Sequence, residues 1–446
     1  MALIISIFKK FLLITTIISF TFVSASAQTL TSMVNQILDS HEDIVNAKKE
    51  LEEAGRDITD ALLAYAPDLS VKYESGRNDK YAAASTSQLN FDTWDFTWKQ
   101  KIMDSGATLN GIRNKELESE KSELDFVTAR NDLLIEAADA YLGLIKAGEK
   151  LEASVAAEEN TRATSGQEEI RVQVGSGLAS DVLKAKRQLA SAQKTVITDE
   201  KSFKSAVFTF EKLFKTEAVD AGKLVKPRLS PDALAMVPNS MEATVELALA
   251  SNRDLMKSKM DVEIARNDLN VALAGFGPSV DAELKYSDKQ DASHTGGNHN
   301  EEQAKVTVEF PLSGLYMEMP GYLNDRSALD RAINDLAVKE RDTVKKAKEA
   351  WIEYSNARTM LSYSENEATI AQELLTIAQK ERAADQTDAA AVLSAEETLE
   401  SSLKDLSDDS MSLVTSVYEI LDVINLLEPS MIENTKVEGT FNTSSS

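Results

Sequence analysis

The sequence carries one pattern twice. A shift of 211 positions places several residues of the segment 38–67 on identical residues, and Pro67 then falls on Pro278. Farther along, a shift of 210 positions places Asp132 on Asp342. A nearly constant offset over ~180 residues indicates an internal duplication. The chain is therefore expected to fold as two similar units joined in series.

Each copy begins with a predicted helix that ends at a proline. Residues 30–65 show helical spacing of apolar residues. The dipeptide Ala66-Pro67 ends this helix, because the residue before a proline avoids the helical region. The second copy repeats the junction at Gly277-Pro278. Both copies thus change from helix to extended chain at the same point.

Alternating residues after each proline predict a β-hairpin. The two hairpins are expected over 67–102 and 278–312, with polar loops at 76–88 and 287–304. Because each loop lies between the two strands of its hairpin, both loops lie at the same end of the strands. The helices then leave from the other end.

A long helix follows each hairpin. In the first copy the segment 107–174 contains no proline, Gly175-Ser176-Gly177 breaks it, and a second helix is expected over 178–214. Nine of the ten a/d heptad positions from 182 to 213 are apolar, and the exception is Asp199. Asp409 lies 210 residues farther along in the second copy. The duplication therefore includes the polar interruption of the apolar seam.

The first residues have the pattern of a secretory signal. Two lysines, a short apolar run and Ala25-Ser26-Ala27 predict cleavage before Gln28; the alternative is an uncleaved membrane anchor. No later stretch has 18 consecutive apolar residues. The predicted division is signal 1–27, first repeat 28–215, linker 216–240, second repeat 241–428 and C-terminal tail 429–446.

Composition excludes several classes of protein. The chain has 446 residues, no cysteine, and 73 acidic against 48 basic residues, for a net charge of −25. It therefore forms no disulfide, and it is poorly suited to nucleic acid, which is bound by neutralising phosphates. The sequence has no nucleophile elbow, phosphate loop or metalloprotease motif. We expect no enzyme activity, no cofactor and no metal site.

Four strands cannot close a membrane barrel by themselves. The smallest transmembrane barrels have eight strands, and an open edge in lipid leaves backbone groups without hydrogen bonds. Long helices with narrow apolar seams must also pack on one another or on other chains. The pattern favours an oligomeric tube with shared strands in a membrane and long helices projecting to one side.

At this level of detail the chain resembles the TolC-like outer membrane efflux proteins, also called outer membrane factors. The resemblance rests on the duplication, the two helix–proline–strand junctions, and the pairs Ala140-Tyr141 and Ala350-Trp351. Its most specific element is Val174-Gly175 followed after five residues by Asp181-Val182. This segment is similar to the turn at the periplasmic helix tips of that family.

The resemblance implies a mainly helical fold with a small β part, in a homotrimer. Three chains would give a 12-stranded outer-membrane barrel and a 12-helix tunnel across the periplasm. Such trimers are the exit channels of tripartite efflux pumps or type I secretion systems. Their partners are outer-membrane lipid, a periplasmic adaptor (membrane fusion) protein and an inner-membrane transporter of the ABC or RND type.

The resemblance also implies that the helix tips act as a gate. Gly175 and Gly177 supply the turn. Asp181 matches the family's aspartate, which ties neighbouring tip helices in the closed state. Because Asp is also a common helix N-cap after a glycine turn, an N-cap role for Asp181 is the alternative.

In the second repeat, the family's ring of aspartates falls on Ala391 and Ser394. This departure puts the usual acidic constriction in question. Asp385 and Asp388 lie within two turns of those positions. They could form a displaced ring of aspartates, and the alternative is that they are solvent-exposed residues at a helix end. A ring of carboxylates would favour cations in the lumen.

Aromatic residues of the hairpins suggest a membrane interface. Tyr73, Trp94, Phe96, Trp98 and Tyr286 are expected to form an aromatic girdle, where amphipathic rings meet lipid headgroups. The alternative is an ordinary packed face of the sheet, which would need a covering layer.

Two functions of different classes are compatible with the sequence. The first is a passive outer-membrane exit channel gated at the periplasmic helix tips. The alternative is a soluble periplasmic coiled-coil adaptor or scaffold protein. Adaptors do not usually carry two strand pairs long enough to span a bilayer at ~9–11 residues per strand, which favours the channel.

Overall fold

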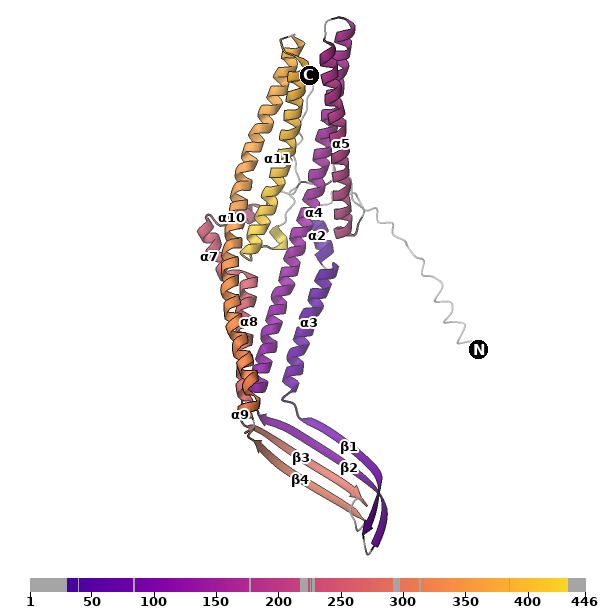
Figure 1. Cartoon of the computed structure of the whole chain (residues 1–446), viewed down its shortest axis with the longest axis vertical. Coiled ribbons are helices and arrows are strands. Elements are labelled where there is room, and N and C mark those ends of the chain that lie inside the picture. Colours follow the sequence, from indigo (N-terminus) through magenta and orange to yellow (C-terminus); the bar gives the residue numbers. More distant parts are fainter. Residues whose placement is uncertain are drawn as a thin grey trace, which may run out of the picture.

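The protein is a long rod with a sheet at one end, as seen in a computed structural model (Figure 1). The structure describes residues 30–38, 40–82, 85–175, 178–216, 224, 226, 229–291, 297–312, 314–384 and 386–431. The predicted signal 1–27 and most of the tail 429–446 lie outside this part of the chain.

The described elements follow the order expected from the duplication. The first repeat contains α2 (Leu30–Leu38), α3 (Glu42–Leu63), β1 (Asp68–Ala82), β2 (Ser85–Met103), α4 (Ala107–Gln173) and α5 (Ala179–Phe214). The second contains α7 (Met241–Ser251), α8 (Arg253–Ala274), β3 (Ser279–Gln290), β4 (Asn298–Glu309), α9 (Gly314–Met317), α10 (Met319–Ala383) and α11 (Ala389–Val423). Between and after them lie α6 (Pro231–Met236) and the short helix η2 (Pro429–Met431).

The long helices confirm the predicted mainly α fold with a small β part. At 1.5 Å per residue, the 67 residues of α4 span about 100 Å. In Figure 1 the pairs α4/α5 and α10/α11 run away from the sheet as two helical hairpins. Their tips lie at the far end of the rod from the strands.

The first predicted helix, 30–65, is wrong in one respect, because it is broken in two. α2 ends at Leu38, and α3 starts after His41, whose Nδ1 accepts a hydrogen bond of 3.4 Å from the N–H of Asp43. The second repeat has the same break, where Asn252 caps α8. Position 41 plus 211 is 252, so the break is part of the duplicated unit.

The sheet is a four-stranded antiparallel sheet in the order β1-β2-β3-β4. The predicted loops 76–88 and 287–304 are wrong in extent, because the strands continue into them on both sides. Tyr81 still pairs with Thr86 beside the first turn. Most residues of these two segments are polar in the sequence, so the apolar alternation fails although the backbone ladder continues.

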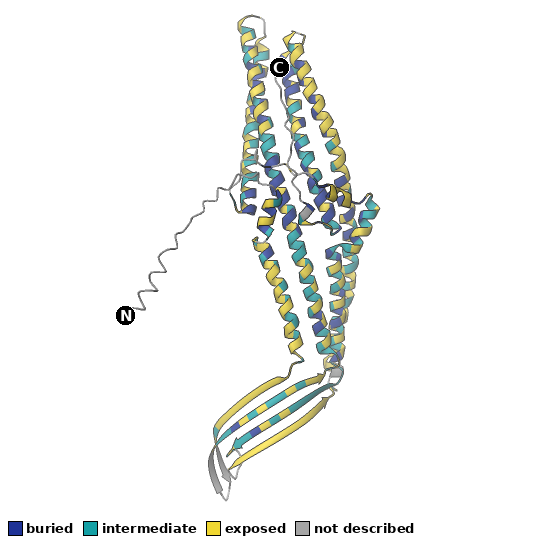
Figure 2. Ribbon diagram, turned by 180° about the vertical axis from the view of Figure 1, so that it is seen from behind, coloured by how far each residue is buried: buried dark blue, intermediate teal, exposed yellow. Residues whose placement is uncertain are grey.

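The largest apolar core lies midway along the rod, at the level of α2, α6 and α7 (Figure 2). Tyr141 of α4 and Tyr418 of α11 are fully buried there, beside Phe210 of α5. This cluster joins the two repeats at the middle of the molecule. The helical hairpins are thus held together by an apolar core at the rod's centre.

None of the described helices has an apolar stretch long enough to cross a membrane.

Candidate functional site

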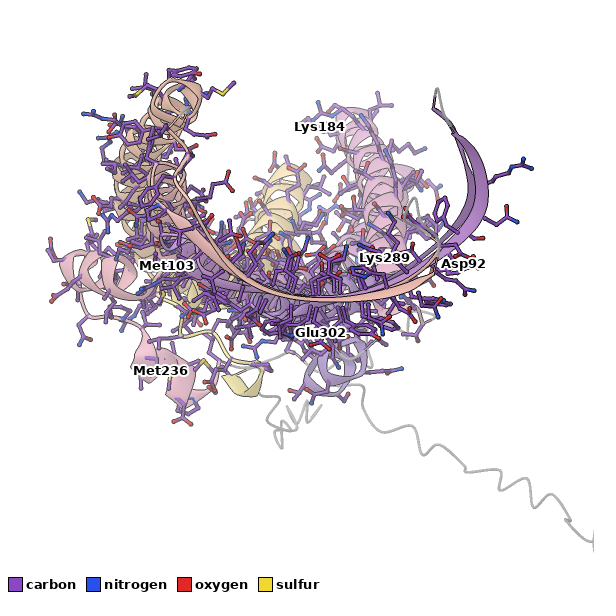
Figure 3. The ribbon with its side chains drawn as sticks, turned by 90° about the horizontal axis from the view of Figure 1, so that it is seen from below. Asp92, Met103, Lys184, Met236, Lys289 and Glu302 are labelled. Atoms are coloured by element: carbon purple, nitrogen blue, oxygen red, sulfur yellow. The ribbon has the colours of Figure 1, made fainter. Side chains whose placement is uncertain are left out.

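The curved sheet has one polar and one apolar face. Figure 3 looks along the rod and shows Lys289 on the concave side and Glu302 at the convex side. On the concave face Lys285 pairs with Asp95, with an Nζ–Oδ2 distance of 3.1 Å, and Ser287 also donates to Asp95. The concave face thus carries charged and hydroxyl groups in register across β2 and β3.

The convex face is apolar and exposed. Exposed apolar side chains lie on this face in all four strands: Leu69 and Val71 of β1, Trp94 and Phe96 of β2, Leu284 of β3, and Val306 and Val308 of β4. Side chains with this degree of exposure on one continuous face indicate a surface that is covered by something other than water.

A row of aromatic rings crosses this face at the outer border of the apolar area. The ring centroids are 4.6 Å apart for Tyr73 and Trp94, 6.5 Å for Trp94 and Phe96, and 6.1 Å for Phe96 and Tyr286. Beyond this row, toward the turns, the same face carries the polar Asp92. The structure therefore brings four of the five predicted girdle residues into one continuous row.

Trp98 lies on the same face but apart from this row. It pairs with Leu69 on β1 and Leu284 on β3, four residues from Trp94 along β2. At about 3.3 Å per strand residue this places it ~13 Å nearer the helices. Trp98 therefore belongs to the middle of the apolar area.

The predicted helix–strand junctions lie at the boundary between rod and sheet. Pro67 directly precedes β1, and Pro278 directly precedes β3. Ser105, two residues before α4, donates a hydrogen bond of 2.7 Å to the carbonyl of Pro278. This bond ties the junction of one repeat to that of the other, which sequence spacing does not predict.

At the tip of the first hairpin, Gly175 has φ +78°, a left-handed conformation that glycine adopts without strain. Gly177 lies outside the described residues. The N-cap interpretation of Asp181 is wrong: Leu178 holds that position and Asp181 lies in the first turn of α5. Its Oδ1 instead accepts from Lys184 Nζ at 3.2 Å.

At the tip of the second hairpin, Asp388 is the N-cap of α11. Its Oδ1 accepts a hydrogen bond of 3.0 Å from the N–H of Ala391. Asp388 is exposed. Asp385, the other candidate for a displaced acidic ring, lies outside the described residues.

An ion pair just inside the tips joins the two hairpins, and sequence analysis missed it. Arg382 of α10 donates from Nε to Glu168 Oε1 of α4 at 3.1 Å, and from Nη1 to the carbonyl of Thr387 at 2.9 Å. The Glu168 side chain is only 3% exposed, so this contact excludes water. The two residues are 214 positions apart, and no local pattern connects them.

Glu396 of α11 lies beside this ion pair. A 350 Å³ cavity is lined by Glu168, Arg171, Arg382 and Glu396 among others. Burial raises the pKa of Glu396, and hydrogen bonds from Thr164 and Thr161 oppose the shift only in part. The contact between α4 and α11 near the tips therefore contains a carboxyl group whose charge is unfavourable.

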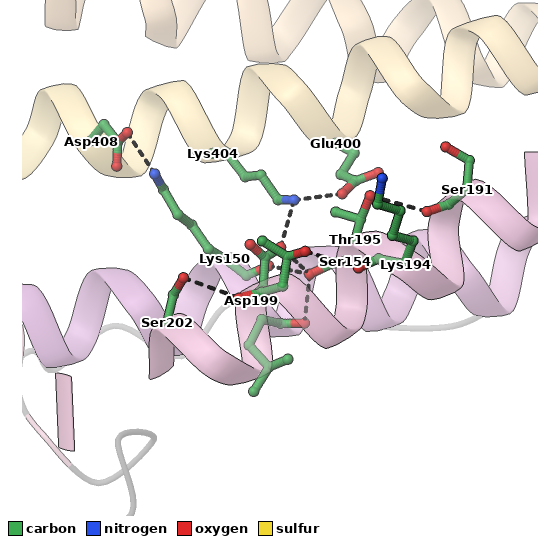
Figure 4. A network of polar contacts seen from close by, with 12 residues as sticks. Lys150, Ser154, Ser191, Lys194, Thr195, Asp199, Ser202, Glu400, Lys404 and Asp408 are labelled. Carbon is green, nitrogen blue, oxygen red and sulfur yellow. Dashed lines mark hydrogen bonds and ion pairs between the residues drawn. The ribbon is translucent and has the colours of Figure 1, made fainter. Parts of the chain in front are cut away.

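Farther from the tips, the polar interruption of the seam forms a network between the hairpins (Figure 4). Asp199 of α5 accepts from Lys404 Nζ of α11 at 2.8 Å and from Ser154 Oγ of α4 at 2.6 Å. Lys404 also pairs with Glu400 at 2.6 Å. Burial lowers the pKa of Lys404, but these two carboxylates more than offset it and leave the pKa raised.

Within the described ranges, no group of three or more His, Asp or Glu side chains could hold a metal ion.

Comparison with known proteins shows which family this chain is similar to. The model of the outer membrane efflux protein family matches residues 33–214 and 244–425, one match in each repeat. The chain is 22% identical over 307 residues to the outer membrane protein TolC of Vibrio cholerae, covering 65% of this chain and 68% of that protein. It is 22% identical over 382 residues to the alkaline protease secretion protein AprF of Pseudomonas aeruginosa, covering 83% and 79%.

Solved structures show the same fold. The outer membrane protein VceC of Vibrio cholerae superposes with a TM-score of 0.76 at 15% identity, covering 89% of this chain and 95% of that one. The predicted fold and the predicted family resemblance are thereby confirmed. The chain belongs to the outer membrane efflux protein family and is a transport protein of the outer membrane, not a soluble periplasmic adaptor.

Proposed function

We propose that three copies of this chain form the passive exit channel of a tripartite export system. The strands contribute to a shared barrel in the outer membrane, and the helical hairpins form a periplasmic tunnel. A periplasmic adaptor and an inner-membrane transporter of the ABC or RND type engage the channel from the other side. The domain division 28–215, 216–240 and 241–428 belongs to the same proposal.

The observation that carries this proposal is the two-faced, open-edged sheet. Its convex face is apolar and its concave face is charged, which suits lipid outside and water inside. β1 and β4 are edge strands. In a bilayer, unpaired edge groups are each unfavourable by several kcal/mol, so the edges require further strands.

The number of strands supports a trimer. Four strands per chain fall short of the eight in the smallest transmembrane barrels, and bacterial barrels have even strand numbers. The family resemblance selects three chains and therefore a 12-stranded wall. The aromatic row from Tyr73 to Tyr286 would then continue around the barrel as the girdle at the outer interface.

A gate at the tips is part of the proposal. Gly175, Gly177 and Asp181 form one tip, and Asp385 and Asp388 belong to the other. The buried ion pair between Arg382 and Glu168 holds the two tips of one chain together. Opening requires this contact to be exchanged for contacts with the adaptor, because a partner can shift the equilibrium only by binding the open state better.

We propose two classes of compound as candidate cargo. One relative bears the name TolC and the other is an alkaline protease secretion protein. The name of the second relative supports polypeptides as one candidate cargo. The efflux named in the family's description supports drug-like compounds as the other.

Export by a strain that lacks its own channel tests the proposal. The full-length chain should remain in the outer membrane after a salt wash and should restore either drug resistance or polypeptide secretion when the cognate adaptor and transporter are supplied. Purified protein should also conduct ions in planar bilayers. A protein that fractionates as soluble and does not conduct would contradict the proposal.

A further inference from the structure

The passage from strand to long helix differs between the two repeats. In the first repeat, residues 104–106 alone join β2 to α4, whereas in the second repeat residues 310–318 join β4 to α10. The longer passage includes the short helix α9, which lies at the boundary between sheet and rod (Figure 1). We call residues 310–319 the connecting segment. The duplicated pattern does not account for it.

The connecting segment is apolar and exposed. Its sequence is FPLSGLYMEM, in which Glu318 is the only charged residue. Leu312 is 78% exposed, Tyr316 is 71% exposed and Met317 is 68% exposed. Apolar side chains exposed together in this way mark a surface that contacts another protein or a membrane.

The contacts that hold this segment to the rod use other side chains. The Glu318 side chain lies beside Gly275 at the end of α8. The ring of Tyr322, in the first turns of α10, meets the ring of Phe276 edge-on, with a centroid distance of 6.4 Å. These contacts fix the start of α10 on the end of α8. The exposed apolar side chains are thus not needed for this attachment.

The connecting segment continues the convex apolar face of the sheet. Phe310 follows Val306 and Val308 at the two-residue interval of one strand face, and it is 63% exposed. The N–H of Leu312 donates a hydrogen bond of 2.9 Å to the carbonyl of Phe310. The chain therefore turns tightly at Pro311 and keeps Leu312 beside the end of β4.

The apolar face of the sheet is shorter than the membrane that it must cross. Tyr286 in the aromatic row and Ser279 at the start of β3 are ~23 Å apart along the strand at ~3.3 Å per residue. At a tilt of ~35–45°, this face is ~18 Å tall, whereas the apolar band of a transmembrane barrel is ~25 Å tall. Asp92 and Asp288 follow on the turn side. The missing ~7 Å therefore lies on the rod side.

The second aromatic border is also absent from the strands at this end. Transmembrane barrels carry aromatic residues at both membrane interfaces. The rod-side ends of the described strands carry Leu69, Val280 and Val308 on the convex face. Phe310 and Tyr316 are the next aromatic residues along the chain after β4. A tyrosine, with an apolar ring and a polar hydroxyl, suits a membrane interface.

We propose that the connecting segment lies in the periplasmic leaflet of the outer membrane. Leu312, Tyr316 and Met317 contact the lipid where the headgroups meet the acyl chains. The occupant is lipid rather than a neighbouring copy, because the segment continues the lipid-facing side of the sheet at the depth that the bilayer thickness requires.

The inference rests on the membrane-embedded sheet of the proposed function and assigns a second, non-barrel contact with the membrane. Only the second repeat provides this contact among the described residues. Because α10 begins at the end of the connecting segment, the segment fixes the depth at which this helix leaves the membrane.

A tryptophan placed in the connecting segment tests the inference. The background is the full-length chain with Trp94→Phe, Trp98→Phe and Trp351→Phe, which removes all three native tryptophans. With Tyr316→Trp added, the protein is reconstituted in phosphatidylcholine vesicles brominated near the headgroup. The bromolipid should quench the fluorescence ~2-fold or more, because interfacial aromatic rings lie at this depth. Absence of quenching would overturn the inference.

Tyr363 provides a matched control on α10. Its side chain is 66% exposed, similar to that of Tyr316, but it lies ~66 Å beyond the start of the helix. In the same background, Tyr363→Trp should not respond to brominated lipid and should be quenched more strongly by acrylamide in water. Equal responses of the two reporters would contradict the proposed membrane contact.

A reporter in the sheet separates this inference from the proposed function. Trp94→Phe with Trp351→Phe leaves Trp98 in the middle of the apolar face. If lipid brominated deep in the acyl chains quenches Trp98 but no bromolipid quenches the Tyr316→Trp reporter, the inference is wrong and the membrane-embedded sheet stands. If neither reporter is quenched, the proposed function fails as well.

Shielding from both quenchers would identify a different occupant. A reporter introduced by Tyr316→Trp that responds to neither acrylamide nor brominated lipid lies against protein, and the inference is then overturned in favour of a neighbouring copy. Leu312→Trp in the same background is a second reporter, which keeps the test independent of a folding defect caused by Tyr316→Trp. Its response to brominated lipid should match that of Tyr316→Trp.

Bilayer thickness gives a further test of depth. In vesicles with 14-carbon acyl chains the sheet alone approaches the bilayer thickness, so quenching of the Tyr316→Trp reporter should fall by about half relative to 18-carbon chains. Chains of 22 carbons should increase it. Quenching of Trp98 should change less, because it lies within the apolar band in each case. A response of the Tyr316→Trp reporter that is independent of thickness would overturn the assigned depth.

Discussion

Ser154 on α4 donates a hydrogen bond of 2.6 Å to Asp199 on α5. The corresponding bond from Ser364 to Asp409 lies 210 residues farther along, with the same spacing of 45 residues between donor and acceptor. An interruption of an apolar seam is thus built in the same way in both repeats. Duplicated polar contacts of this kind define which surfaces of the two repeats are equivalent.

Loss of the seam carboxylate is expected to weaken the hairpin contact. Asp199→Ala removes the partner of Ser154 and one partner of Lys404, whose side chain is 18% exposed. We expect the free energy of unfolding to fall by about 1–3 kcal/mol, because buried polar groups lose hydrogen bonds. Thermal unfolding followed by circular dichroism measures the change.

Thr198→Ala is the matched control for this variant. Thr198 is exposed, and its hydroxyl donates a hydrogen bond to the carbonyl of Lys194 in its own helix. Its removal should alter stability by no more than ~0.5 kcal/mol. Equal effects of the two substitutions on the free energy of unfolding would mean that the network around Asp199 does not stabilise the hairpin contact.

Removal of the tip ion pair is expected to favour the open channel. Arg382→Ala leaves Glu168 buried without its cation and removes the contact between α4 and α10. The mean single-channel conductance in planar bilayers should rise several-fold. Arg358→Ala, on an exposed part of the same helix, is the control and should leave conductance unchanged. A closed, low-conductance Arg382→Ala channel would show that the gate lies elsewhere.

Stability near the tip should depend on pH through Glu396. Because burial raises its pKa, the folded chain holds this proton more tightly than the unfolded chain does. Stability is therefore expected to fall as the pH rises from the ordinary glutamate pKa through the raised value. The groups that face Glu396 across the cavity are Glu168, Arg171 and Arg382.

Glu396→Gln tests this pH dependence. The neutral side chain should stabilise the protein at neutral pH and flatten the dependence of melting temperature on pH. The exposed Glu373 of α10 provides the control, because Glu373→Gln should preserve the original slope. An unchanged slope in Glu396→Gln would exclude Glu396 as its source.

Tryptophan depth tests the proposed girdle. Trp94 belongs to the aromatic row at the outer border of the apolar face, and Trp98 lies ~13 Å nearer the helices. With Trp351→Phe as background, Trp98→Phe leaves Trp94 as the sole reporter, and Trp94→Phe leaves Trp98. Lipids brominated near the headgroup should quench Trp94 more, and lipids brominated deep in the chain should quench Trp98 more. The reverse order would contradict the girdle.

The sequence was sufficient to predict the elements that repeat. The duplication, the heptad seam and the prolines at 67 and 278 predicted the long helices, the hairpins and their order, because each depends on local spacing. The break before α3 was missed, since apolar spacing continues across it. Its signal was the capping type of Asn252 at the position equivalent to His41.

Contacts between distant segments could not be predicted in the same way. The ion pair of Glu168 and Arg382 depends on how two helices cross, and the residues at the 210-residue offset, Ala378 and Val172, are not charged. The N-cap role considered as the alternative for Asp181 belongs to Leu178, because α5 starts one residue after Leu178. The Ser105 bond to Pro278 likewise joins residues 173 positions apart.

The central claim is that one chain supplies a third of the closed barrel and of the helical tunnel. Native mass spectrometry of the full-length protein, released from detergent micelles, tests it most directly. The account predicts a dominant species of three chains. No monomer is expected at protein concentrations well above the dissociation constant of the trimer. A dominant monomer would contradict it, because a four-stranded sheet would then stand in the membrane with both edges open.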